Sequence, residues 1–185
     1  MGKKVILFIL FFFSLTFIAP KQETYAEKHS AQSASLLKAQ ETPGYDNRVL
    51  ILEQYLEKWD SPLASNAGKF VEEADKYNLD WKFVASIAGL ESSFGKFLPY
   101  NSYNAWGWGI YGTNVHYFKS YDEGIATISK GLRENYIDKW GAKDIYEIGS
   151  LYAASPTWAE RVIGFMNSID TFEKEMETKT LPISL

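Results

Sequence analysis

The chain has 185 residues, enough for one ordinary domain with a hydrophobic core, and a formal net charge of −4. It has no cysteine, which excludes disulfides, thiol nucleophiles and zinc fingers, and its two histidines do not favour a metal site. No cluster of lysine and arginine points to a nucleic-acid partner. We therefore expect no metal, no cofactor and no nucleic acid, and a neutral or mixed-charge ligand such as a glycan is compatible with the composition.

The first 26 residues have the features of a secretory signal. Lys3 and Lys4 precede an apolar run over 5–18, and a small-residue cleavage site ends at Ala26. The run is rather short for a membrane-spanning helix, which needs about 20 residues, so an uncleaved N-terminal anchor is the alternative. Residues 27–45 are polar and are predicted to be a linker. We expect a secreted or cell-envelope bacterial protein that contacts a membrane only through this N-terminal segment, and the sequence leaves its oligomeric state open.

Helices are predicted over most of residues 46–175, because apolar residues recur at helical spacing and follow helix start signals. The expected segments are 46–58 starting at Asp46, 61–77 starting at Ser61 with a break near 66–68, 80–91 starting at Asp80, 120–136 starting at Ser120, 144–152 starting at Asp144, and a last helix from Ser155 to about Glu175. Residues 176–185 are predicted to be a disordered tail.

Residues 95–119 lack a helical period and contain glycine, proline, asparagine and many aromatic residues. This composition predicts a long loop, with a short β-hairpin around 111–114. The predicted fold class is therefore mainly α, a helical domain with one long aromatic loop or short hairpin between two helices.

Glu91 is the first candidate for chemistry. It ends an apolar helical stretch, where its same-face neighbours are Val84, Ile87 and Ala88. A carboxylate in such surroundings is costly unless it is paired or protonated. The helix dipole also disfavours a carboxylate at a C-terminal end. We therefore expect Glu91 to be shielded from water and to act as a proton donor, as cleavage of a glycosidic bond requires.

The segment from Asn104 to Gly109 is the second candidate. It carries Trp106, Gly107 and Trp108 beside Asn104. Indole faces can stack on sugars, amides can hydrogen-bond hydroxyl or acetamido groups, and glycine permits close approach. An aromatic loop that only covers the core explains the same residues equally well.

Four segments occur in order along the chain: Glu91-Ser-Ser-Phe-Gly95, Asn104-Ala-Trp-Gly107, Phe118-Lys-Ser-Tyr121 and Tyr152-Ala-Ala-Ser-Pro156-Thr-Trp-Ala159. Together they resemble the bacterial β-N-acetylglucosaminidases that cleave peptidoglycan (glycoside hydrolase family 73), which belong to the lysozyme-like superfamily. That family has a Glu-Ser-x-x-Gly helix end, an Asn-x-Phe/Trp-Gly segment, a Phe-Arg-x-Tyr segment and a Tyr-Ala-Thr-Asp-Pro-like motif. The similarity spans about residues 60–172.

This resemblance implies a lysozyme-like catalytic domain over residues 46–175, peptidoglycan or a related N-acetylated glycan as the substrate, and Glu91 as the general acid. It also implies that Tyr152 lies in the cleft near the scissile bond, as a second catalytic residue beside Glu91. Substrate-binding roles fall to Ser92, Asn104, Trp106, Gly107 and Trp108.

The second carboxylate often assigned to that family has no counterpart between Ser92 and Tyr121, because this stretch contains neither Asp nor Glu. The nearest candidates are Asp122 and Glu123, but Ser120-x-x-Glu123 is also a capping box and Asp122 suits the first turn of a helix. Three alternatives stay open. The acetamido group of the substrate could act as the nucleophile, the chain could be a lytic transglycosylase with one acid/base, or it could be a non-catalytic cell-wall-binding module.

Overall fold

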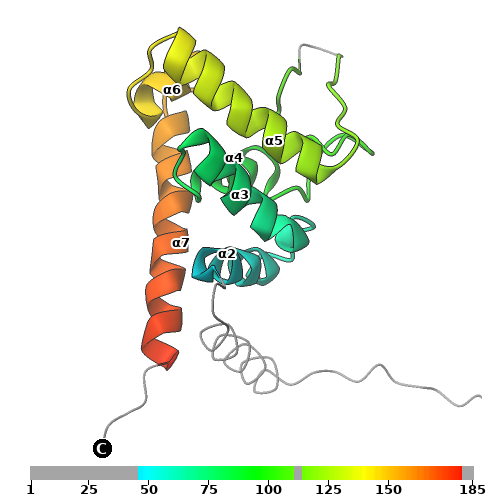
Figure 1. Ribbon diagram of the computed structural model, residues 1–185. Coiled ribbons are helices and arrows are strands. Elements are labelled where there is room, and N and C mark those ends of the chain that lie inside the picture. Colours follow the sequence, from blue (N-terminus) through cyan, green and yellow to red (C-terminus); the bar gives the residue numbers. More distant parts are fainter. Residues whose placement is uncertain (1–45, 111–113, 181–185) are drawn as a thin grey trace, which may run out of the picture.

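The computed structural model describes residues 46–110 and 114–180, which contain six α-helices and no β-strand (Figure 1). In chain order the elements are α2 (Asn47–Lys58), the 3-10 helix η1 (Ala64–Asn66), α3 (Ala67–Tyr77), α4 (Phe83–Ser92), α5 (Tyr121–Gly131), the π-helix η2 (Leu132–Lys139), α6 (Ile145–Tyr152) and α7 (Trp158–Thr180). The predicted mainly α architecture is confirmed.

Helix α4 lies in the centre of the fold, and α7, the longest helix, packs along it. Helix α3 packs against α5, while α2 contacts both α3 and α7, so the helices enclose one core (Figure 1). Every residue of α4 from Phe83 to Gly89 is buried. The C-terminal turn of α4 is the part of the helix that reaches the surface.

The start signals in the sequence form the expected caps. The carboxylates of Asp46 and Asp144 accept hydrogen bonds from backbone N–H groups in the first turns of α2 and α6. The hydroxyl of Ser120 accepts from the N–H of Glu123 at the start of α5. These caps explain why the predicted starts of the three helices are correct.

Several element boundaries differ from the prediction. Helices α4 and α7 begin at Phe83 and Trp158, each three residues after the expected starts at Asp80 and Ser155. Helix α7 continues to Thr180, past the expected end near Glu175, and Met176 is buried. Helix α5 passes into a π-helix over Leu132–Lys139 instead of continuing as an α-helix to Tyr136. A π-helix shifts the side-chain period, which apolar spacing alone does not reveal.

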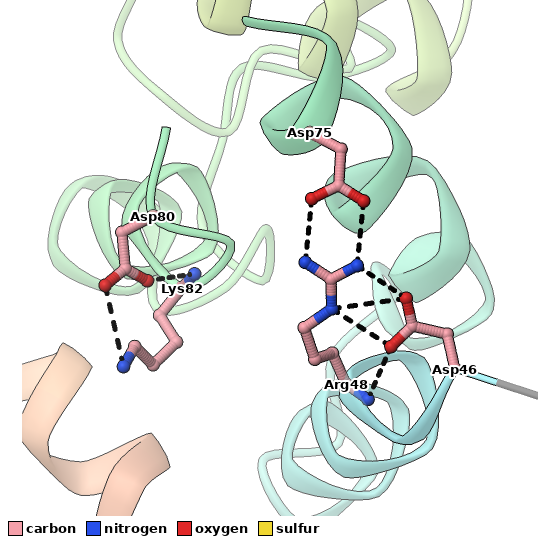
Figure 2. A network of polar contacts seen from close by, with 5 residues as sticks. All are labelled: Asp46, Arg48, Asp75, Asp80 and Lys82. Atoms are coloured by element: carbon pink, nitrogen blue, oxygen red, sulfur yellow. Dashed lines mark hydrogen bonds and ion pairs between the residues drawn. The ribbon is translucent and has the colours of Figure 1, made fainter. Parts of the chain in front are cut away.

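A network of charges connects the ends of α2 and α3 (Figure 2). The guanidinium of Arg48 lies between two carboxylates, 2.6 Å from Asp46 and 2.7 Å from Asp75. Hydrogen bonds from Arg48 lower the pKa values of both Asp46 and Asp75, and the same bonds raise the pKa of Arg48. Farther along the chain, Lys82 bonds Asp170 at 2.6 Å and joins the start of α4 to α7.

Several predictions concern residues outside the described ranges. The secretory signal, the linker over 27–45 and the turn of the predicted hairpin at 111–113 belong to this group. The described residues on either side of 111–113 form no strand, so the predicted hairpin is not seen there. None of the helices in the described part of the chain combines the length and the apolar character needed to cross a bilayer.

Candidate functional site

The turn after α4 fixes the position of Glu91. The three residues Ser93, Phe94 and Gly95 all have left-handed backbone angles, with φ of 50°, 59° and 81°. The N–H of Phe94 bonds the carbonyl of Ala88, six positions earlier, and this bond closes the end of the helix. A left-handed conformation costs about 1–2 kcal/mol for a residue other than glycine. Two such residues in succession mark a strained segment of the kind that gathers at functional sites.

Ser92 joins this turn to the aromatic loop. Its hydroxyl lies 2.8 Å from the carbonyl oxygen of Ala105 and accepts a hydrogen bond from the N–H of Gly95 at 2.8 Å. The side chain is buried. The sequence predicted a substrate-binding role for Ser92, whereas the structure gives its hydroxyl to the connection between α4 and the loop.

Glu91 itself is exposed, so the prediction that it is shielded from water is wrong. Because every residue of α4 from Phe83 to Gly89 is buried, the apolar neighbours of Glu91 do not show whether its own side chain is buried or lies in the last turn, which reaches the surface. Glu91 is nevertheless not a freely solvated carboxylate. Its Oε1 accepts a hydrogen bond from the indole Nε1 of Trp158 at 2.8 Å. Its Oε2 lies beside Gly107, where a Cβ atom would be 3.6 Å away.

Tyr152 packs against Trp158, the hydrogen-bond partner of the Glu91 carboxylate. The rings of Tyr152 and Trp158 stack with centroids 4.8 Å apart and planes 27° apart. The hydroxyl of Tyr152 donates to the backbone carbonyl of Trp106 at 2.8 Å. Burial, and then the negative charge of Glu91, raise the pKa of Tyr152 well above its ordinary value. Tyr152 therefore stays protonated and neutral, and its ring forms part of the aromatic surface beside the carboxylate.

Trp106 is a core residue, which does not fit its predicted role in lining a cleft. Its side chain has no exposed surface, and its indole N–H donates to the carbonyl of Val84 in α4 at 2.9 Å. The ring packs against Phe118 and against Gly124, where a Cβ atom would come within 2.5 Å of it. Only the backbone carbonyl of Trp106 takes part in the site.

The amide of Asn104 is used inside the loop. Its Nδ2 donates to the carbonyls of Trp108 and His116, and its Oδ1 accepts from the N–H of Trp108 at 3.0 Å. The residue is 2% exposed. The predicted hydrogen bonds from this amide to a glycan have no free donor, so Asn104 holds the loop that carries Gly107.

Gly107 and Trp108 remain at or near the surface, as their predicted roles require. Gly107 is exposed with φ of +63°, a conformation that favours glycine. Trp108 is partly buried and contacts the rings of Tyr136 and Tyr152 at centroid distances of 6.1 and 6.0 Å. These rings form one wall beside the Glu91 carboxylate and its partner Trp158.

Asp122 and Glu123, the predicted alternatives for a second carboxylate, both have structural partners. Glu123 forms the expected capping box, since its carboxylate accepts from the N–H of Lys119 and its own N–H donates to Ser120. Asp122 accepts a hydrogen bond from the side chain of Asn66 at 2.7 Å. Neither is hydrogen-bonded to Glu91 or to its partner Trp158.

Trp158 and Tyr136 are site residues that the sequence did not assign. Trp158 lies inside the last of the four quoted segments, so its position there was a usable signal. Tyr136 lies on the π-helix η2, whose altered side-chain period cannot be predicted from apolar spacing, so the sequence does not show which way Tyr136 faces.

A hollow of about 280 Å³ between α6 and the start of α7 contains none of the predicted site residues and no charged lining residue.

The described residues contain no group of histidine, aspartate and glutamate able to hold a metal ion. The arrangement can therefore be described by its own side chains: one oriented carboxylate, a neutral aromatic wall and an exposed glycine beside the free oxygen. A carboxyl group placed in this way can transfer a proton to or from a bound ligand.

No protein-family model matches the chain, and no curated protein is significantly similar to it.

Proposed function

We propose that this chain is an exported glycosidase that cleaves the glycan strand of peptidoglycan, as an endo-β-N-acetylglucosaminidase with a lysozyme-like fold. In this proposal Glu91 is the general acid. It gives its proton to the glycosidic oxygen as the bond from that oxygen to the anomeric carbon breaks. The leaving sugar then departs as a neutral alcohol.

The observation that carries this proposal is the setting of the Glu91 carboxylate. One oxygen is held by Trp158 at 2.8 Å, and the other lies beside the exposed Gly107. The nearby wall of Trp108 and Tyr152 offers apolar ring surface of the kind on which sugars pack. Glu91, Gly107 and Tyr152 each lie in one of the four segments that carry the resemblance.

The partners of Asp122 and Glu123 favour a mechanism with one protein carboxylate. In that mechanism the carbonyl oxygen of the substrate's 2-acetamido group attacks the anomeric carbon as the leaving group departs. Water then opens the cyclic intermediate, and Glu91, now ionised, accepts a proton from that water. The acetamido group takes the place that a second carboxylate holds in the two-carboxylate scheme.

The same observation also supports the second candidate, a lytic transglycosylase. Here the 6-hydroxyl of the sugar closes onto its own anomeric carbon, and Glu91 serves in turn as acid and as base. No water enters the product. This reaction likewise needs one carboxyl group that touches both the leaving oxygen and the incoming hydroxyl.

The product ends distinguish these reactions. Purified peptidoglycan digested with the full chain, then reduced and analysed by mass spectrometry, should contain new N-acetylglucosamine residues at reducing ends, each with the mass of one added water. Products with 1,6-anhydro ends would replace the hydrolase assignment with the transglycosylase. Intact peptidoglycan after exhaustive incubation would contradict both and leave a binding module.

A further inference from the structure

We propose that Trp158 is a positioning residue that selects which oxygen of Glu91 reacts. Its indole N–H holds Oε1, so the proton is carried and delivered by Oε2. This inference rests on the proposed function for its catalytic consequence. The orientation of the carboxylate can also be tested without turnover.

The placement of Trp158 is rigid. It is the first residue of α7 and only 2% exposed. One side of its ring stacks on Tyr152, whose own hydroxyl is fixed by the carbonyl of Trp106. Gly149 of α6 lies close to the ring as well, and a Cβ atom there would be 2.9 Å from it. These contacts hold the indole in one orientation, so its N–H keeps pointing in the same direction when the Glu91 side chain rotates.

The chemistry of the indole N–H determines the rest. It is a donor only, and it does not ionise in the range where proteins are folded. An oxygen that accepts this hydrogen bond is the carbonyl oxygen of the protonated carboxyl group, because the acidic proton occupies the other one. When Glu91 is protonated, the proton therefore resides on Oε2.

Oε2 is also the oxygen that a ligand can reach. It lies next to Gly107, which is exposed and has no side chain to fill the space above the carboxylate. The loop carrying Gly107 is fixed on both sides by Ser92 and Asn104. In the proposed reaction the bond between Oε2 and its proton breaks, and a new O–H bond forms on the leaving glycosidic oxygen. The indole N–H then stabilises the negative charge that remains on the carboxylate.

Replacing Trp158 with phenylalanine tests the catalytic part, because the ring stack on Tyr152 is kept while the donor is lost. We expect kcat on peptidoglycan fragments to fall about 10-fold or more with KM within about 2-fold, since orientation acts on the transition state rather than on ground-state binding. Trp81→Phe, at the opposite end of α4, is the matched control and should keep the parent kcat. A Trp158→Phe protein that folds and retains the parent kcat would overturn the inference.

The hydrogen bond itself is tested by nuclear magnetic resonance on 15N-labelled protein. The chain has 6 tryptophans, and the indole N–H signal of Trp158 is the one that is missing from the spectrum of Trp158→Phe. Glu91→Ala should move this signal and leave the other indole signals in place. An unmoved Trp158 signal means that the indole does not hold Glu91, whatever the activity. A parent protein without turnover contradicts the proposed function alone, since this signal still decides how the carboxylate is held.

Discussion

Glu91 presents its two oxygens to different surroundings, and this asymmetry is the most specific feature of the site. Oε1 meets a buried N–H donor, whereas Oε2 meets the open space beside Gly107. The sequence singled out Glu91 as the candidate acid, but its expectation that Glu91 is shielded from water is wrong. Its neighbours one turn back are buried because every residue of α4 from Phe83 to Gly89 is buried, whereas Glu91 lies in the last turn of the helix and is exposed.

Asn104 shows how a residue can matter to a site without touching a ligand. Its amide makes three hydrogen bonds to the backbone of the loop that carries Gly107. From sequence alone, an asparagine that precedes an aromatic residue and a glycine has two interpretations: its amide could hydrogen-bond a ligand, or it could hydrogen-bond the backbone of its own loop and so act as a clamp on that loop. The clamp prevails here because both amide N–H groups already have carbonyl partners.

We expect Asn104→Ala to lower the free energy of unfolding by about 2 kcal/mol, because buried backbone groups left without partners cost about 1–3 kcal/mol. Turnover should also fall, since Gly107 moves with the loop. Denaturant unfolding followed by circular dichroism measures the stability change. Asn167→Ala on the exposed side of α7 serves as the control, and an Asn104 variant as stable as this control would show that the clamp is unimportant.

The turn at the end of α4 and the loop after it form one unit. Ser92 bonds the carbonyl of Ala105, and Tyr152 bonds the carbonyl of Trp106, so two side chains from α4 and α6 hold adjacent peptide groups. The sequence predicted the starts of α2, α5 and α6, because a cap depends on residues within one turn of each other. The loop conformation depends on partners far along the chain and was not predictable in the same way.

Helix η2 is the clearest element that the sequence did not predict. Leu132 and Tyr136 are both buried, which fits the i, i+4 spacing of an α-helix, but the hydrogen bonds follow the wider π pattern. The switch brings Tyr136 against Trp108 and Tyr152. These ring partners are 28 and 16 positions away in the sequence, so local apolar spacing does not predict them.

Helix α3 carries a buried carboxylate with a definite pH signature. Burial alone would raise the pKa of Glu73, but hydrogen bonds from Lys69 at 2.7 Å and Lys76 at 3.2 Å outweigh it, and the net pKa is lowered from its ordinary value of 4.5. A lowered pKa in the folded state stabilises the fold above the unfolded-state value. This stabilisation is lost as the pH falls below about 4.5 and through the folded-state pKa.

Glu73→Gln should therefore be less stable than the parent by about 1 kcal/mol at pH 7, and the difference should shrink as the pH falls from 5 toward 3. Urea unfolding at a series of pH values measures both effects. The control is Glu72→Gln, since Glu72 pairs with Lys69 but is largely exposed. Parallel stability curves for the Glu73 variant and the parent across this range would refute the assignment.

Across the whole molecule, the fold brings together residues that are distant in sequence. Glu91 and Trp158 are 67 positions apart, and the packing of α4 against α7 makes them neighbours. Of the four motif segments, those beginning at Glu91, Asn104 and Tyr152 meet at the candidate site. The fourth, beginning at Phe118, does not reach the site itself, and its Phe118 ring packs against the buried ring of Trp106.

The sequence predicted the helical class and the helices that carry Glu91, Tyr152 and Trp158, because both follow from apolar spacing and helix start signals. It did not distinguish residues that face a ligand from residues that hold the scaffold. Trp106 and Asn104 were predicted to bind substrate and instead use their polar groups on the backbone. Residue type is the same in both cases, and only the positions of distant carbonyls separate them.

Release of reducing sugar ends from purified peptidoglycan, compared between the parent chain and Glu91→Gln, tests the role of Glu91 most directly. The amide is close to the carboxylate in size but cannot donate a proton as an acid. General acid catalysis contributes at least about 100-fold, so we expect the variant to lose at least that factor in turnover while it still binds the glycan in a sedimentation assay. Equal turnover by the two proteins would contradict the assignment of Glu91 as the catalytic acid.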